Sequence, residues 1–323
     1  MAMRMPLASD VHVDKMLTNV LVGTTNEYYI ADQIFPVVLV DKQTDIIPQV
    51  DQSHFFRNDL STPGAEGDVA PEIGYKVTTS MTYLCKLYHG RHFISDERRV
   101  NEDNPFNSDR DGALLVDQAL RIQRERNFVS NFWALSKWTT DVTGGTTVTK
   151  WSDYGTSTPI EDIRKYKRTV FNYVARYANK LVLGNMTRDR LMDHPDVLDR
   201  IKYTERGIAS EDLLKALFDV DSLLVGANLY TATAEGVAEA SVAYTSNWDD
   251  DALLLYTPTS PSIWQTSAGY TFVWRIAGVG NEMQAVRKYR NDEKRGEYIE
   301  VNTYYDNKQI NANLGVFFSD IVD

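Results

Sequence analysis

The sequence predicts an α+β fold in which an N-terminal arm and an extended β-hairpin precede two lobes. Three observations lead to this prediction: two long helical patterns in the first half, a mixed α/β pattern after residue 180, and a run of strands at the end. At 323 residues the chain is long for one hydrophobic core, so two lobes are expected. Its 43% hydrophobic and 24% charged residues are typical of a globular protein.

The composition excludes several classes of protein. The net charge of −11 argues against a dedicated nucleic-acid binder, which carries a basic face to neutralise phosphates. No stretch approaches the roughly 18 apolar residues of a membrane helix, and the N-terminus lacks the apolar core of a signal peptide. Cys85 is the only cysteine, so no disulfide forms within the chain, which suits a reducing cytoplasm. We expect Cys85 to be a small buried or strand residue.

The first 94 residues predict two projecting segments. Residues 1–41 form the N-terminal arm, with a short amphipathic piece at 11–21 and then IADQIFPVVLV, whose proline suits an edge strand. Residues 42–94 form the extended hairpin loop, in which two loosely alternating segments flank the Gly- and Pro-rich tip STPGAEGDVAPEIG. A lone hairpin of this length is marginally stable in water. Either the rest of this chain or another copy must supply a surface for it.

Two long helices are predicted within residues 95–179. The first runs from Asp109 to about Ser136, and its apolar residues recur at helical spacing, with Arg126 as an exception. Its predicted buried stripe is Leu115, Ala119, Ile122, Val129 and Trp133. The second begins at Thr158-Pro159-Ile160-Glu161, with Thr at the N-cap, Pro at the first helical position and Glu placed to complete a capping box. Its predicted stripe is Ile163, Tyr166, Val170, Val174 and Tyr177.

Residues 180–280 predict a mixed α/β domain. The strand KLVLG is followed by helical segments near residue 188 and at 195–203, the helix EDLLKALF, and the strands SLLVGAN, DALLLYTP and YTFVW. Residues 281–323 are predicted to be strands: MQAVRKYR, then EYIEVNTYY after the turn NDEKRG, and a last strand near NLGVFF.

The turn after KLVLG is the first candidate for chemistry. A strand, Gly184 and a helix resemble a nucleotide-binding turn, but the turn has neither further glycines nor a lysine to hold phosphate. The triplet His194-Pro195-Asp196 resembles a co-chaperone signature, in a sequence unlike that basic helical module. We interpret it as a helix start, with Pro195 in the first turn and Asp196 near the positive helix end.

Other polar clusters do not form a recognisable site. His89 and His92 point to opposite faces if they lie on a strand, and the acidic run at 249–251 lacks the spacing of a calcium loop. The five histidines show no Ser/His/Asp or Cys/His constellation. The sequence therefore predicts no catalytic, cofactor-binding or metal-binding residue, and a protein that is not an enzyme.

The first long helix carries a basic cluster, Arg121, Arg124 and Arg126. Such a run is able to face nucleic acid. Because Gln123 and Glu125 alternate with the arginines, the pattern is more typical of a solvated or subunit-facing helix surface.

The order of these parts resembles the major capsid proteins of tailed bacteriophages, which have the Hong Kong 97 coat fold. The stretches that carry the resemblance are IADQIFPVVLVDKQTDIIP, ISDERRVNEDNPFN, STPIEDIRKYKRTVF, NKLVLGNMTRDRLMDHPDVLDRIKYT, DLLKALFDVDSLLVGANLY, LLLYTPTSPSIWQTSAGYTFVW and EYIEVNTYYDNKQINANLGVFF. They cover nearly the whole chain, and their joint order is what makes the resemblance specific.

The resemblance implies a domain organisation. Residues 95–179 would form a peripheral domain with the first long helix as its spine, and residues 180–280 an axial domain. Residues 281–323 would be strands that return to the peripheral domain. The hairpin would reach across a neighbouring subunit, and the arm would pack on a neighbour.

The resemblance also implies a function. The chain would self-assemble through pentamers and hexamers into the icosahedral shell of a virion, which encloses a double-stranded DNA genome without sequence-specific binding. Assembly would take place in the host cytoplasm, with a portal and in some cases a decoration protein. No long N-terminal scaffolding segment is present, so a separate scaffolding protein or cleavage of a longer precursor is implied. The residues expected at intersubunit contacts are Pro63, Gly64, Glu66, Gly67, Pro71, Arg121, Arg124 and Arg126.

Three alternatives stay open at this point. A nanocompartment of the encapsulin type has the same fold and holds an enzyme cargo in place of a genome. A cytoplasmic α/β enzyme would be a monomer or small oligomer whose activity depends on His194 or Asp196. A β-rich adhesion or tail protein fits the final strands but not the two long helices.

Overall fold

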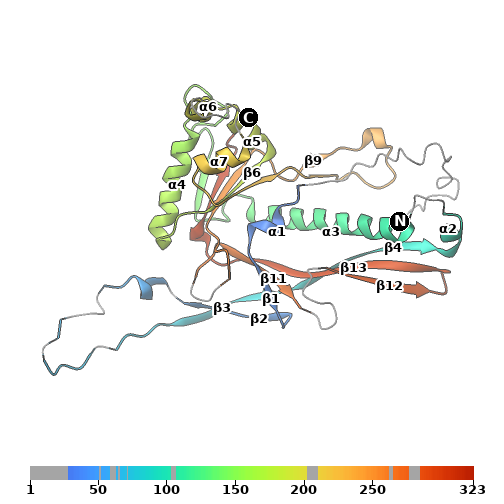
Figure 1. Ribbon diagram of the computed structural model, residues 1–323, viewed down its shortest axis with the longest axis horizontal. Coiled ribbons are helices and arrows are strands. Elements are labelled where there is room, and N and C mark those ends of the chain that lie inside the picture. The colour runs from blue at the N-terminus through green and yellow to red at the C-terminus, as the bar shows by residue number, and fades with distance from the viewer. Residues whose placement is uncertain are drawn as a thin grey trace.

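The computed structural model describes residues 28–50, 52–58, 63–64, 66–70, 72–102, 107–201, 210–261, 265–275 and 284–323. In this part of the chain two five-stranded sheets form the body, and an extended hairpin projects from it (Figure 1). The amphipathic piece predicted at 11–21 lies outside the described residues.

The first sheet, here called the peripheral sheet, is long and antiparallel apart from one edge. Its strands are β1 (Val37–Val40), β11 (Gly269–Trp274), β13 (Gly296–Gln309), β12 (Gln284–Asn291) and β4 (Lys86–Ser95). The 14-residue β13 is its centre, because it pairs with β11 and β12 in turn and with β4 along its other edge. β1 follows Pro36 and lies at the edge, parallel to β11, which confirms the predicted edge strand.

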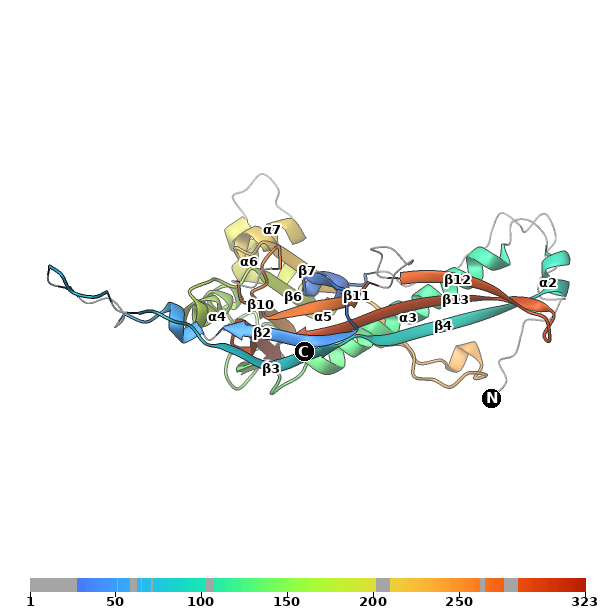
Figure 2. The same cartoon turned by 90° about the horizontal axis from the view of Figure 1, so that it is seen from below.

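The long helix α3 (Ser108–Phe132) lies along one face of the peripheral sheet (Figures 1 and 2). Glycines permit this close packing: a Cβ on Gly112 would lie 2.7 Å from the His92 ring, and one on Gly90 would lie 2.9 Å from Val116. The predicted helix is confirmed, but its predicted stripe is wrong in part: Leu115 is 60% exposed and Ala119 is exposed, whereas Trp133 is 6% exposed. The buried face includes Gly112, Val116, Arg124, Glu125, Phe128 and Phe132. This face includes a glycine and two charged residues, which a search for apolar residues at helical spacing leaves out.

The second sheet, here called the axial sheet, is more deeply buried. Its strands, in spatial order, are β5 (Thr140–Thr143), β14 (Gly315–Ser319), β10 (Ala252–Leu255), β6 (Lys180–Gly184) and β7 (Ser222–Gly226). Every residue of β10 is buried. The helices beside this sheet are α4 (Pro159–Val174), α5 (Asn185–Met192), α6 (Pro195–Ile201) and α7 (Glu211–Leu217) (Figure 1).

Helix α4 agrees with most of what the local sequence predicts for it. It begins at Pro159 with Thr158 at the N-cap position, as predicted, although the Thr158 side chain makes no capping hydrogen bond. Its stripe from Ile163 to Val174 is buried, whereas Tyr177 lies beyond the helix end and is 58% exposed.

The long helix α3 and the axial sheet share the main core. Phe128 and Phe132 of α3 belong to the same buried cluster as Leu181 of β6 and Phe317 of β14. Sheet membership crosses the boundaries expected from the sequence: β5 and β14 lie in the axial sheet, whereas β11 lies in the peripheral sheet. The last strand therefore returns to the axial sheet, and only β12 and β13 join the peripheral one.

Candidate assembly surfaces

An extended hairpin leaves the subunit at one end. β2 (Thr44–Val50) pairs antiparallel with β3 (Val77–Leu84), and the chain beyond them runs away from both sheets (Figures 1 and 2). The register shifts between Ile47 and Gln49, at Pro48, which has no N–H for the ladder. The predicted hairpin is confirmed, but its predicted return strand is too long. After Cys85 the chain continues as β4, which pairs with β13 instead.

A small apolar cluster fixes the root of the hairpin. Tyr83 and Cys85 are buried with Tyr270 and Phe272 of β11, and the rings of Tyr83 and Phe272 stack 4.6 Å apart. Burial raises the pKa of the Cys85 thiol to about 12, so the thiol stays protonated. Cys85 is the small buried residue that the sequence predicts.

Beyond its root the hairpin exposes large apolar side chains. They include Ile46, Phe55, Phe56, Ile73 and Tyr75, each between 50% and 65% exposed. Single exposed apolar residues are ordinary, whereas several of them on one projecting segment are typical of a surface that another molecule covers.

The predicted contact residues at the hairpin tip lie in the open. Pro63, Gly64, Glu66 and Gly67 are exposed, and Pro71 lies outside the described residues. Gly67 has a φ of +94°, which glycine adopts without strain. The role of these residues at an interface stays a prediction.

The three arginines of α3 have different surroundings. Arg121 and Arg126 are exposed on the helix surface. Arg124 is buried in its own subunit, where its Nε lies 2.5 Å from Asp32 Oδ1 and its guanidinium lies 4.7 Å from the centre of the Tyr305 ring. The intersubunit role proposed for all three stays a prediction, and Arg124 in addition holds two elements of its own chain together.

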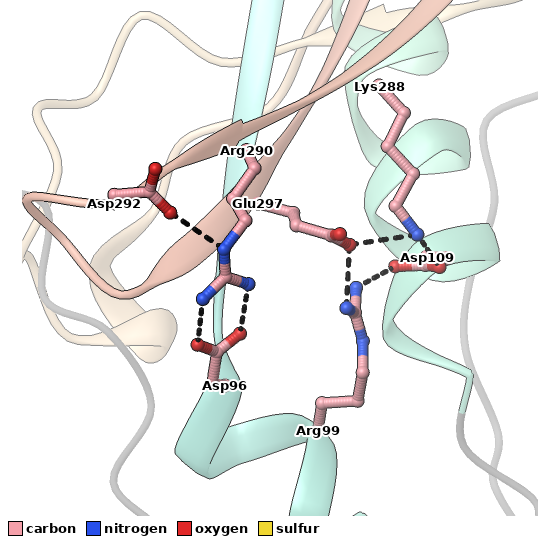
Figure 3. A network of polar contacts seen from close by, with 7 residues as sticks. All are labelled: Asp96, Arg99, Asp109, Lys288, Arg290, Asp292 and Glu297. Atoms are coloured by element: carbon pink, nitrogen blue, oxygen red, sulfur yellow. Dashed lines mark hydrogen bonds and ion pairs between the residues drawn. The ribbon is translucent and has the colours of Figure 1, made fainter.

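Seven charged side chains form a network at the far end of the peripheral sheet (Figure 3). They are Asp96, Arg99, Asp109, Lys288, Arg290, Asp292 and Glu297. Arg290 binds Asp96 through two nitrogens, at 2.8 and 3.1 Å, and Arg99 and Lys288 each bridge Asp109 and Glu297.

This network links two helices to the peripheral sheet. It ties α2 (Asp96–Val100) and the start of α3 to β12 and β13. The hydrogen bond from Lys288 holds the pKa of both Asp109 and Glu297 below its usual range. Sequence analysis missed the network because Asp96 and Arg290 are 194 positions apart, and no local signal links them.

The His194-Pro195-Asp196 triplet is structural. His194 is 1% exposed, and its Nδ1 accepts a hydrogen bond from the Asp196 N–H at 3.1 Å. Nε2 therefore carries the proton and donates to Ser157 Oγ at 2.8 Å, while the Ser157 hydroxyl donates to the Asp153 carbonyl. A nucleophilic serine needs the reverse arrangement, in which the imidazole accepts the hydroxyl proton. Burial also lowers the pKa of His194, and α6 begins at Pro195 as predicted.

The remaining polar candidates are dispersed. His92 faces α3, whereas His89 lies three positions earlier on β4 and so on the opposite face. Within the described ranges, no group of three or more His, Cys, Asp or Glu residues is placed to hold a metal ion. Asp251 accepts a hydrogen bond from the Asp320 N–H at 2.7 Å, and burial raises its pKa to about 7. None of the described helices is both long and apolar enough to cross a membrane.

Comparison with known proteins gives one consistent answer. No protein-family profile matches the chain. The major capsid protein of Burkholderia phage BcepMu is 24% identical over 271 residues, which is 80% of this chain and 82% of that protein. A crystal structure of a phage-related protein from Bordetella bronchiseptica RB50 matches with a TM-score of 0.69 and 19% identity, over 96% of this chain and 97% of that one. The capsid of cyanophage P-SCSP1u matches with a TM-score of 0.59 and 10% identity, over 98% and 99%.

In sequence and in fold, the chain is similar to the major capsid proteins of tailed bacteriophages. It also matches an encapsulin complex from Synechococcus elongatus PCC 7942, with a TM-score of 0.52 and 10% identity over 97% of this chain and 96% of that one. That likeness concerns the fold alone. The hairpin and the network of Figure 3 lie at opposite ends of the chain (Figures 1 and 3).

Proposed function

We propose that this chain is the major capsid protein that assembles through pentamers and hexamers into the icosahedral shell around a double-stranded DNA phage genome. The mature location is the virion, and assembly takes place in the host cytoplasm. The observation that carries the proposal is the hairpin: it extends beyond both sheets (Figure 1) and exposes large apolar side chains.

The hairpin defines a heterologous contact, in which one subunit's ribbon lies on a different surface of the next subunit. Heterologous contacts form closed rings when the rotation between subunits closes. Slight bending at the hairpin permits rings of both five and six. Several modest interfaces of this kind for each subunit stabilise a shell without any single strong pair.

The partners follow from the same proposal. The shell needs a scaffolding protein or a cleaved precursor to set its curvature and a portal at one vertex, and a decoration protein is compatible with it. The net charge of −11 supports a shell that encloses DNA without adhering to it, because the charge opposes phosphate binding. The role is structural, and the Ser157–His194 arrangement supports a protein without catalytic function.

A nanocompartment shell is the second candidate, and the fold likeness to an encapsulin favours it. The two candidates differ in content rather than in subunit structure. Neighbouring genes distinguish them, since terminase and portal genes accompany a phage coat whereas an enzyme gene accompanies a nanocompartment.

Negative-stain electron microscopy of the protein, expressed with and without its genomic neighbours, tests the proposal. We expect closed shells, rings of five or six subunits, or tubes. A particle of one to four chains that never assembles, even with a scaffolding partner, would overturn the proposal. Nuclease-protected DNA inside particles from infected cells supports the phage coat, and an enriched enzyme supports the nanocompartment.

A further inference from the structure

The short helix α1 (Ala31–Ile34) occupies a junction in the subunit. It lies between α3 and the axial sheet, and the chain leaves it through β1 into the hairpin (Figure 1). The next residue, Phe35, packs against both Phe128 and Phe132, with ring centres 5.1 and 5.2 Å away. The hairpin therefore starts from this one turn of helix.

A carboxylate from α3 holds the N-terminal end of α1. Glu125 Oε1 accepts hydrogen bonds from the backbone N–H groups of Ile30 and Ala31, both at 2.7 Å. Glu125 Oε2 accepts from Trp248 Nε1 at 2.8 Å. The residue is 2% exposed, so these donors replace water around a buried carboxylate.

An ammonium group from the axial sheet holds the other end. Lys180, the first residue of β6, donates from Nζ to the carbonyls of Gln33 at 2.7 Å and Ile34 at 3.0 Å. A helix of four residues leaves nearly all its end groups unsatisfied and is not stable alone. Its negative cap at the N-terminus and positive cap at the C-terminus also match the direction of the helix dipole.

We propose that Glu125 and Lys180 form a two-ended charge clamp on α1, and that this clamp is the joint through which neighbour contacts act on the relative position of the spine helix and the axial sheet. The inference rests on the proposed function, because the arm and hairpin are taken to contact neighbouring subunits. Glu125 and Lys180 are positioning residues: they set the direction in which the chain leaves α1 towards β1 and the hairpin.

Burial disfavours the charged forms of both Glu125 and Lys180. Desolvation raises the pKa of Glu125 to about 7 and lowers the pKa of Lys180 to about 8. The titratable groups that interact with Glu125 are Asp32 on α1, Arg124 on α3 and the phenol of Tyr29. Asp32 adds to the rise in the Glu125 pKa.

The two shifts give opposite pH dependences. The closed clamp binds a proton on Glu125 more tightly than water-exposed glutamate does, so closure weakens as pH rises through the range from about 4.5 to 7. Lys180 releases its proton more readily when clamped, so closure strengthens as pH rises from about 8 to 10.5. The clamp is therefore weakest between pH 7 and 8, where both groups are charged, and closure is roughly tenfold more favourable at pH 6 and pH 9.

Hydrogen–deuterium exchange of the peptide that covers residues 28–40, measured in the unassembled subunit from pH 5 to 9.5, tests the clamp. After correction for the intrinsic pH dependence of exchange, we expect protection of α1 to pass through a minimum near pH 7.5. Glu125→Gln removes the acid limb of this profile and Lys180→Met removes the alkaline limb. Glu235→Gln and Lys137→Met change the same residue types at exposed positions and leave both limbs in place.

Two outcomes would overturn the clamp. One is a wild-type protein in which the protection of α1 does not depend on pH. The other is that both variants lower this protection equally at every pH and keep both limbs of the profile, as the loss of a merely structural contact would. Each variant removes a different limb of the pH profile. If one variant fails to fold, the other still tests the clamp. The joint itself is tested by repeating the measurement on assembled shells, where α1 protection should rise at least tenfold. Shells that form with unchanged α1 exchange refute the joint and leave the capsid function intact. A chain that never forms shells refutes the capsid function, while the profile of the free subunit still decides the clamp.

Discussion

Replacing Phe35 with alanine removes the ring that anchors the end of α1 to α3. Phe35 is 1% exposed, and its ring packs against both Phe128 and Phe132. It also lies against Gly269, where a Cβ would come within 2.6 Å of the ring. Truncation of a fully buried Phe costs about 3–5 kcal/mol, which is the transfer energy of the ring plus that of the cavity left behind. The ratio of folded to unfolded subunit should fall by roughly two to four orders of magnitude.

Urea unfolding of the unassembled subunit, followed by tryptophan fluorescence, measures this loss. Phe55→Ala is the matched control, because it deletes the same ring from the hairpin, where Phe55 is 59% exposed. We expect Phe55→Ala to change the unfolding free energy by less than about 0.5 kcal/mol and to reduce shell formation strongly. A loss below about 1 kcal/mol for Phe35→Ala would refute its assignment to the core. Normal shell formation by Phe55→Ala would refute its assignment to a contact surface.

Three further predictions concern single sites. Gly226→Ala places a Cβ within 2.2 Å of the Trp248 indole and should cost about 1–3 kcal/mol in urea unfolding, with a changed near-ultraviolet circular dichroism spectrum. His194→Ala should cost about 1–3 kcal/mol above pH 6.5, and the difference from wild type should shrink in acid. Because the native pKa of His194 is lowered, wild type itself loses that stability as pH falls; a pH-independent difference would contradict this. Lys288 lowers the pKa of Asp109, so the network of Figure 3 should hold above about pH 4 and loosen below it. Amide exchange in β12 should then accelerate below this pH in the wild type. The acceleration should be much smaller in Asp109→Asn.

The sequence predicts those features that depend on neighbouring residues. The start of α4 at Pro159, the start of α6 at Pro195 and the edge position of β1 after Pro36 follow from what proline does to the backbone around it. The hairpin follows from alternation around a Gly- and Pro-rich tip. Such signals need only a few adjacent residues, so they hold without knowledge of the fold.

Features set by distant partners could not be predicted in this way. The buried face of α3 was assigned wrongly because it depends on which side β4 and β13 present to the helix, and on Gly90 and Gly112 allowing a close approach. The end of β3 at Cys85 was missed because β4 continues the same alternating pattern, and only the pairing with β13 divides the two strands.

Glu125 shows why the assembly residues are the hardest to find. In the sequence it stands among arginines, and its charge pattern is typical of a solvated helix face. Its actual partners, the N–H groups of Ile30 and Ala31, lie 95 and 94 positions earlier in the chain, and they turn the same residue into a buried joint. Residues at an intersubunit contact are still harder to predict, because their partners belong to another copy of the chain. A heterologous contact between hairpin and body therefore has to be found by perturbing each side in turn. Deletions of Phe55 and of the body residue it covers should each abolish the same contact, and removing both should cost no more than removing one.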